Sequence, residues 1–268
     1  MVNHYLNSNA LCAKDAESLK VIEENHLGHF AYLPKLLGFD IREINGVTVI
    51  NCGLKSSMFN IAYGSPNSLK ISDSINEIKK AFAGQPFAWW VPPTDHNQEV
   101  TEIFLQSGLE IETTEHAMVS NLKANIILEK KSDLKITPVT DKLLLSDFLK
   151  VLEVYDSCAN EFYNRINERL LNTDEKLFVG YKDGLPVTIA ILFCRSDSAG
   201  IFSLITNEHS RRQGYGTEMM IFLMKLSKKI GCKTITLSAS SDAATRIYER
   251  IGFRKVGEFE CFEYTGDM

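Results

Sequence analysis

The segment 201–226, which reads IFSLITNEHSRRQGYGTEMMIFLMKL, constrains the fold of this chain more than any other. Its apolar start, Ile201–Thr206, predicts a central strand. Its polar middle holds two arginines and two glycines, and its last part predicts a helix over 216–230, because apolar residues recur there at helical spacing. The segment therefore predicts a strand, turn and helix unit of an α/β protein.

The turn within this segment predicts an anion site. Gly214 and Gly216 have no Cβ, so a ligand can approach the backbone closely. The N–H groups of Gln213–Thr217 at the start of the helix lack helical partners, and together with the helix dipole they attract negative charge. Arg211 and Arg212 add positive charge, which suits a diphosphate. For this pattern alone, a basic turn that merely caps a helix is an equal alternative, and neither a Rossmann nor a Walker pattern is present.

Two linked patterns resemble the GNAT superfamily of N-acetyltransferases. The turn Arg211-Arg212-Gln213-Gly214-Tyr215-Gly216 is similar to the family's acetyl-CoA-binding motif, R/Q-x-x-G-x-G/A. The following stretch 237–253, LSASSDAATRIYERIGF, is similar to the family's A-x-x-x-Y-x-x-x-G-F segment, with Ala244, Tyr248, Gly252 and Phe253 at the matching positions. The resemblance covers about half of the chain, and the two motifs occur in the family's order.

The resemblance implies an enzyme that transfers an acyl group, most simply acetyl, from acyl-CoA to a primary amine without a metal. Tyr248 would lie near the thioester sulfur as general acid, because a phenol with a pKa near 10 can protonate a departing thiolate. The alternative for Tyr248 is a core-packed ring with its hydroxyl in water. The cofactor-binding residues implied by the resemblance are Leu204, Ile205 and Thr206 for the pantetheine arm, and Arg211, Arg212, Gln213, Gly214, Tyr215, Gly216 and Thr217 for the pyrophosphate.

The general base stays open at this stage. Glu208 and His209 follow the central strand, Glu161 lies on an earlier expected helix, and Ser203 or Ser238 could position a water. Direct attack by the amine is expected, because no cysteine accompanies a histidine near the motif. Two alternatives remain: an acyl-CoA-binding sensor or scaffold without turnover, and a fold that keeps the motif for stability alone.

The chain is expected to hold two GNAT-like α/β (α+β) units, each a mixed, mostly antiparallel sheet flanked by helices. Residues 133–268 would form the acetyltransferase domain and residues 1–125 a degenerate copy. The two units end alike, since EIFLQSGLEI overlays RIYERIGFRK with Gly108 on Gly252 and Phe104 opposite Tyr248. The first unit lacks the basic pair, the glycine spacing and the tyrosine, so we expect it to shape the acceptor pocket rather than to catalyse.

Two features of the first unit have alternatives. One of Trp89 and Trp90 could line a pocket, although both could simply be part-buried in a sheet. His26 and His29 are three residues apart on an expected helix, which can suit a metal. No cysteine or carboxylate pattern accompanies them, so we expect structural or exposed roles and no metal site.

Composition sets the cellular context. A net charge of -5 disfavours general nucleic-acid binding, which needs clustered Lys and Arg. The N-terminus shows no signal peptide, and runs such as Met219–Met224 are too short to span a bilayer, so we expect a cytoplasmic protein without a membrane partner. The expected partner is a small-molecule or peptide amine acceptor, and a homodimer is compatible with the sequence.

Periodicity and turn residues predict the other elements. Helices are expected over 14–37, 72–83, 97–107, 141–155, 161–171, 216–230 and 243–250. Strands are expected over 39–43, 47–51, 58–63, 86–91, 109–122, 134–136, 177–181, 187–194, 201–206, 234–238 and 253–264.

Overall fold

A computed structural model describes residues 2–67, 71–122 and 133–266, with side chains from residue 15 onward. The first half of the chain contains α1 (Val2–Leu36), β1 (Asp40–Ile44), β2 (Val47–Asn51), β3 (Ile61–Tyr63), α2 (Ile71–Ala81), β4 (Phe87–Val91), η1 (Pro93–Asp95), α3 (Gln98–Gln106) and β5 (Glu110–Asn121). The second half contains β6 (Lys135–Pro138), α4 (Lys142–Leu152), α5 (Ala159–Tyr163), η2 (Glu168–Leu170), β7 (Glu175–Lys182), β8 (Leu185–Arg195), β9 (Ser198–Thr206), η3 (Glu208–Ser210), α6 (Tyr215–Lys229), β10 (Thr234–Ala239), α7 (Asp242–Arg250) and β11 (Arg254–Tyr264).

The strands form one sheet in the order β1-β2-β3-β4-β11-β5-β10-β9-β8-β7-β6. Two neighbouring pairs are parallel, β3 with β4 and β9 with β10, and the other pairs are antiparallel. Each half of the chain thus contributes one parallel pair inside an antiparallel run. This confirms the predicted mixed, mostly antiparallel architecture.

The two halves of the sheet are joined by an exchange of long strands. β11, the last strand of the chain, lies between β4 and β5, so that Phe262 pairs with both Trp89 and Ile111. β5, from the first half, lies between β11 and β10, where Ala117 pairs with Ser238. Each half of the sheet is therefore completed by a strand from the other half of the chain.

The elements leading into these two strands repeat each other. α3 and α7 are each nine residues long and each begins after a side-chain N-cap, Asn97 in one case and Ser241 in the other. Each helix is followed at the same distance by a glycine with a positive φ, 78° at Gly108 and 99° at Gly252, and then by a long strand. This repetition matches the sequence overlay and supports an internal duplication.

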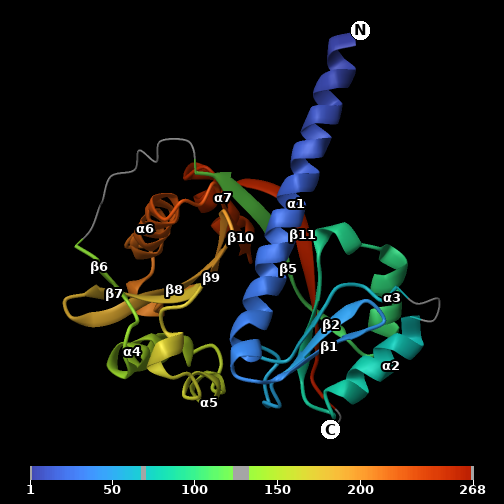
Figure 1. Cartoon of the computed structure of the whole chain (residues 1–268), viewed down its shortest axis with the longest axis horizontal. Coiled ribbons are helices and arrows are strands. Elements are labelled where there is room, and N and C mark those ends of the chain that lie inside the picture. The colour runs from blue at the N-terminus through green and yellow to red at the C-terminus, as the bar shows by residue number, and fades with distance from the viewer. Residues whose placement is uncertain (1, 68–70, 123–132, 267–268) are drawn as a thin grey trace.

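Helices cover both faces of the sheet (Figure 1). α1, α4 and α5 pack on one face, where their apolar side chains share a core with residues of both sheet halves, such as Ile61 and Ile189. On the opposite face, α2 and α3 cover the first half and α6 covers the second half. α1, dark blue in Figure 1, crosses the middle of the molecule and contacts strands from both halves.

Several predicted elements differ from the structure. The helix predicted over 141–155 ends at Leu152, and the strand predicted over 58–63 begins at Ile61. The single helix expected over 161–171 is replaced by α5 and η2, because the Asn167 side chain accepts a hydrogen bond from the Arg169 N–H and starts a new turn. The helix expected over 14–37 extends back to Val2. The linker expected around 123–133 lies almost wholly outside the described residues, so the unit boundaries at 125 and 133 stay a prediction.

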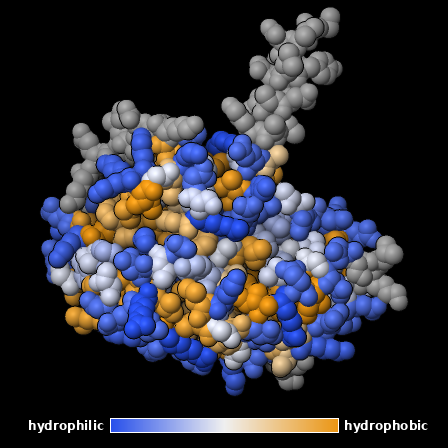
Figure 2. All heavy atoms as spheres, in the orientation of Figure 1, coloured by the Kyte–Doolittle hydropathy of each residue, from blue (hydrophilic) through white to orange (hydrophobic). Residues whose placement is uncertain are grey.

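The surface mixes polar and apolar residues. In the view of Figure 2, hydrophilic residues surround separate hydrophobic patches.

Among the described residues, no helix is both long and apolar enough to cross a membrane. The same residues contain no group of three or more His, Cys, Asp or Glu side chains arranged to hold a metal ion.

The strand exchange predicts a long-range effect on stability. Phe262 of β11 is fully buried among side chains of the first half, including Phe104, whose ring centroid lies 5.1 Å away. Phe262→Ala should lower the free energy of unfolding by about 3–5 kcal/mol, measured by denaturant titration. Ile111, which pairs with Phe262, is half-exposed. Ile111→Ala should therefore lower the free energy of unfolding by only about 1 kcal/mol or less. Equal effects of the two changes would contradict the packing described here.

Candidate active site

The central strands β9 and β10 separate, which leaves a stretch of β9 backbone without a neighbour on that side. Their parallel pairing ends at Ile201 and Leu237. Just beyond, β9 carries a bulge against β8 at Ser203, whose φ is 47°. Leu204, Ile205 and Thr206 follow the bulge and line a cavity of about 570 Å³. Main-chain groups at such a parting are free to bind an extended ligand.

The turn after β9 forms the rest of this cavity. Gly214 is the N-cap of α6 with a φ of 86° and receives no side-chain cap. Within the described residues, the structure shows no hydrogen-bond acceptor for the N–H groups of residues 212–217. The N–H groups at the helix start are therefore free to bind an anion, which is the site that the sequence predicts. Lining residues from this turn are Arg211, Arg212, Gly214, Tyr215, Gly216 and Thr217.

Two of the predicted cofactor residues also brace the turn. The Arg211 guanidinium donates to the Thr206 carbonyl at 3.2 Å and to the Tyr155 hydroxyl at 2.7 Å. Gln213 is the one predicted cofactor residue that is not among the cavity's lining residues. Its side chain donates to the His209 carbonyl and accepts from the Tyr215 hydroxyl at 2.9 Å. Its side chain therefore supports the loop, while its predicted contribution to the cofactor site, the main-chain N–H group, stays a prediction.

A second cavity, of about 360 Å³, adjoins the first and shares Leu204, Ile205, Ser240 and Tyr248 with it. Its walls come partly from the first half of the chain. Lining residues from that half are His26, His29, Phe30, Met58, Trp90 and Glu115. Trp90 therefore lines a cavity, whereas Trp89 is fully buried. His26 and His29 also line this cavity, a position that the sequence did not predict.

Tyr248 and Glu115 meet in this second cavity. Burial and the nearby Glu115 carboxylate raise the pKa of Tyr248 to about 12, so its phenol keeps its proton at any ordinary pH. Burial also raises the pKa of Glu115, against the opposing effect of a hydrogen bond with Ser238. A carboxylate with a raised pKa is a stronger base than an exposed one.

Glu115 was not among the candidate bases, because the sequence assigns it to the first unit and gives no local motif around it. Of the candidates that were considered, Glu161 is exposed and forms an ion pair with Arg165 at 3.0 Å. Glu208 and His209 are exposed in η3, and neither they nor Glu161 line the second cavity. Ser203 and Ser238 do line it.

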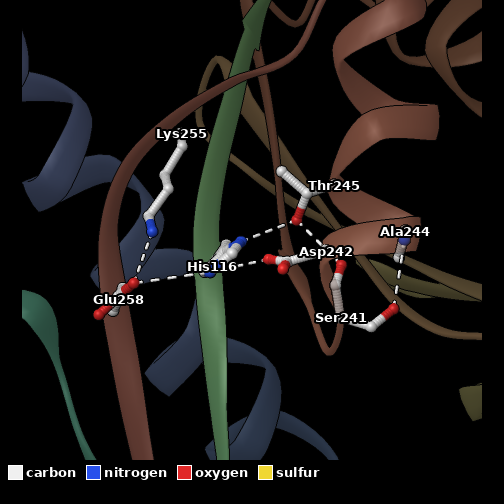
Figure 3. A network of polar contacts seen from close by, with 7 residues as sticks. All are labelled: His116, Ser241, Asp242, Ala244, Thr245, Lys255 and Glu258. Atoms are coloured by element: carbon white, nitrogen blue, oxygen red, sulfur yellow. Dashed lines mark hydrogen bonds and ion pairs between the residues drawn. The ribbon is translucent and has the colours of Figure 1, made fainter.

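A polar network fixes β5 against α7 and β11 (Figure 3). His116, the neighbour of Glu115, contacts the Thr245 hydroxyl of α7 at 2.8 Å. The His116 Nε2 atom lies 3.5 Å from a Glu258 carboxylate oxygen of β11. The Thr245 hydroxyl in turn donates to the Ser241 carbonyl at the start of α7. Because α7 also carries Tyr248, this network sets the position of Glu115 relative to the phenol.

Comparison with known proteins identifies the second half. Residues 143–253 match the model of the acetyltransferase (GNAT) family. This part of the chain is a GNAT acetyltransferase domain. A search of curated proteins finds no match.

The GNAT fold extends over most of the chain in solved structures. A GCN5-related N-acetyltransferase from Kribbella flavida is 15% identical with a TM-score of 0.70, over 92% of this chain and 95% of its own. A functionally unknown conserved protein from Staphylococcus epidermidis is 19% identical with a TM-score of 0.66, over 86% and 96%. A tandem GNAT protein from the clavulanic acid biosynthesis pathway is 9% identical with a TM-score of 0.54, over 83% and 79%. These likenesses concern the fold.

The open helix start predicts a specific response to a methyl group. Gly214→Ala should weaken binding of coenzyme A by about tenfold or more in calorimetric titration, because the added Cβ hinders the approach of phosphates to the N–H groups. Gly231→Ala is the matched control, since Gly231 has a φ of 98° and lies beyond the other end of α6. Both changes strain a left-handed residue by about 1–2 kcal/mol, so equal losses of affinity would show that strain alone is responsible.

Proposed function

We propose that this GNAT domain is an acetyl-CoA-dependent N-acetyltransferase that acts on a primary amine by direct attack. One observation carries the proposal: two cavities meet at Leu204 and Tyr248, one lined by free main-chain amides and arginines, the other by carboxylate and aromatic groups. The first suits an anionic cofactor and the second an amine. The shared wall is where an acyl group would pass between them.

The cofactor is proposed to lie along β9 and the start of α6. Arg212 and the amides of residues 212–217 would hold the pyrophosphate, and the backbone of Leu204–Thr206 would pair with the pantetheine arm. Arg211 would hold the turn in shape through Thr206 and Tyr155. Binding of this kind places the thioester near Tyr248 and supplies the positioning that dominates such transfers.

The acceptor nitrogen would attack the thioester carbonyl carbon as the carbon–sulfur bond breaks. Glu115 is placed to take the proton that the nitrogen loses, and the Tyr248 phenol to donate one to the departing thiolate. The products are an N-acetylated amine and coenzyme A with a free thiol. The amides of the parted strand would stabilise the developing oxyanion.

The cysteines whose side chains the structure describes fit a cytoplasmic setting. Cys52, Cys158, Cys194, Cys232 and Cys261 are all free thiols, and disulfides are rare in reducing compartments. We therefore keep the cytoplasm as the proposed location.

Removal of the phenol hydroxyl tests the acid. Tyr248→Phe should reduce kcat by about 100-fold while leaving the affinity for acetyl-CoA nearly unchanged, because the hydroxyl is needed only as the thiolate departs. Release of free thiol and calorimetric titration measure the two quantities. Tyr181→Phe removes a hydroxyl that contacts Asp147 outside both cavities and should retain full turnover. Unchanged turnover in Tyr248→Phe would remove this residue from the mechanism.

The proposed base, Glu115, predicts a specific dependence of kcat on pH. Because the pKa of Glu115 is raised, kcat should fall as the pH drops through a value above the ordinary pKa of a glutamate, where the carboxylate takes up a proton. Glu115→Gln should lower kcat by about 100-fold and abolish this acid limb. Glu112→Gln, on an exposed residue of the same strand, should keep both the rate and the limb. A limb that persists in Glu115→Gln would assign the base elsewhere.

A further inference from the structure

The second cavity, proposed to take the amine, adjoins a third, smaller cavity of about 130 Å³. The two share His29, Phe30, Met58 and Ser203, so they lie next to each other. The far walls of the smaller cavity are mainly apolar. They include Leu33, Leu152, Phe162 and Ile191.

A buried carboxylate lines this smaller cavity. Glu175, the first residue of β7, is only 1% exposed. Its Oε2 atom lies 2.9 Å from His29 Nδ1, whereas its Oε1 atom has no hydrogen-bond partner among the described residues. A buried acceptor without a donor is costly, and a ligand that brings a donor relieves that cost.

The charges around the two cavities favour a cation. No lysine or arginine lines either cavity, whereas two carboxylates do, Glu115 in the larger one and Glu175 in the smaller one. Burial lowers the pKa of His26 to about 3, so this ring stays neutral and adds no positive charge. The aromatic rings of Phe30 and Trp90 also line the larger cavity, and their faces attract cations.

The two carboxylates lie in different cavities, so each would bind a different positive group of a ligand. Glu115 lies beside Tyr248, where the acyl group would be transferred. Glu175 lies in the other cavity, beyond the shared residues His29 and Met58. A molecule with one amino group would satisfy Glu115 and leave Oε1 of Glu175 without a donor.

We infer that the acceptor is an elongated diamine whose reacting amino group meets Glu115 and whose distal ammonium group is held by Glu175. This inference rests on the proposed acetyl transfer and names the acceptor class for it. The distal ammonium donates to Oε1, while His29 holds the other oxygen and orients the carboxylate. The apolar walls accommodate the carbon chain between the two amino groups.

A series of amines of equal length tests the inference on the unaltered protein. Straight-chain diamines of about three to six carbons are compared with the monoamines and amino alcohols of the same length, scored by release of free thiol from acetyl-CoA. The best diamine should have a kcat/KM about tenfold or more above that of its matched monoamine, mainly through KM. The amino alcohol should fall below the diamine, because a hydroxyl carries no charge.

Glu175→Gln links the preference to the carboxylate. The amide keeps the shape and removes the charge, so the ratio of diamine to monoamine kcat/KM should fall by about tenfold. Glu168→Gln, an exposed change in η2, should keep the ratio of the unaltered protein. Thermal melting checks that each variant is folded. If Glu175→Gln does not fold, the amine series on the unaltered protein tests the inference by itself.

The outcomes separate this inference from the proposed function. Equal kcat/KM for diamines and monoamines overturns the diamine subsite and leaves acetyl transfer in place. A preference that survives in folded Glu175→Gln also overturns the subsite. No thiol release with any amine overturns the proposed function and the inference together.

Discussion

The pairing of β5 with both β10 and β11 is the interaction on which the rest of the structure depends. It joins two half-sheets into one and brings a strand from the first half of the chain against β10 and β11 of the second half. Glu115 enters the site on that strand, and His116 next to it ties the strand to α7 and β11. The first half therefore contributes a carboxylate to the lining of the candidate site as well as shape.

The proposed cofactor site depends on backbone geometry more than on side chains. The bulge at Ser203 and the loss of pairing beyond Ile201 expose main-chain groups of β9, and the left-handed Gly214 starts α6 without a cap. These features place unsatisfied amides along one continuous cavity wall. In the interior of a sheet or helix such groups are paired, so they are available here because β9 loses its neighbour and α6 begins without a side-chain cap.

The sequence predicted the parts of this arrangement that local patterns control. Hydrophobic periodicity and glycine turns gave most helices and strands, and the two motifs indicated the turn before α6 and Tyr248. Local pattern failed at 161–171, where an asparagine cap divides the expected helix. It also failed for His26, His29, Glu115 and Glu175, because those residues come together only through long-range packing between α1, β5 and β7. No spacing along the chain predicts a contact between residues 146 positions apart, such as His29 with Glu175.

The position of β11 has a consequence for how the chain is made. The first half of the chain emerges from the ribosome before the last eleven residues of the sheet are synthesised. Until then, β4 and β5 lack the strand that lies between them, and their unpaired edges are open to wrong partners. The nascent first half must wait for the C-terminus, so final assembly of both halves becomes a single, late event in biosynthesis.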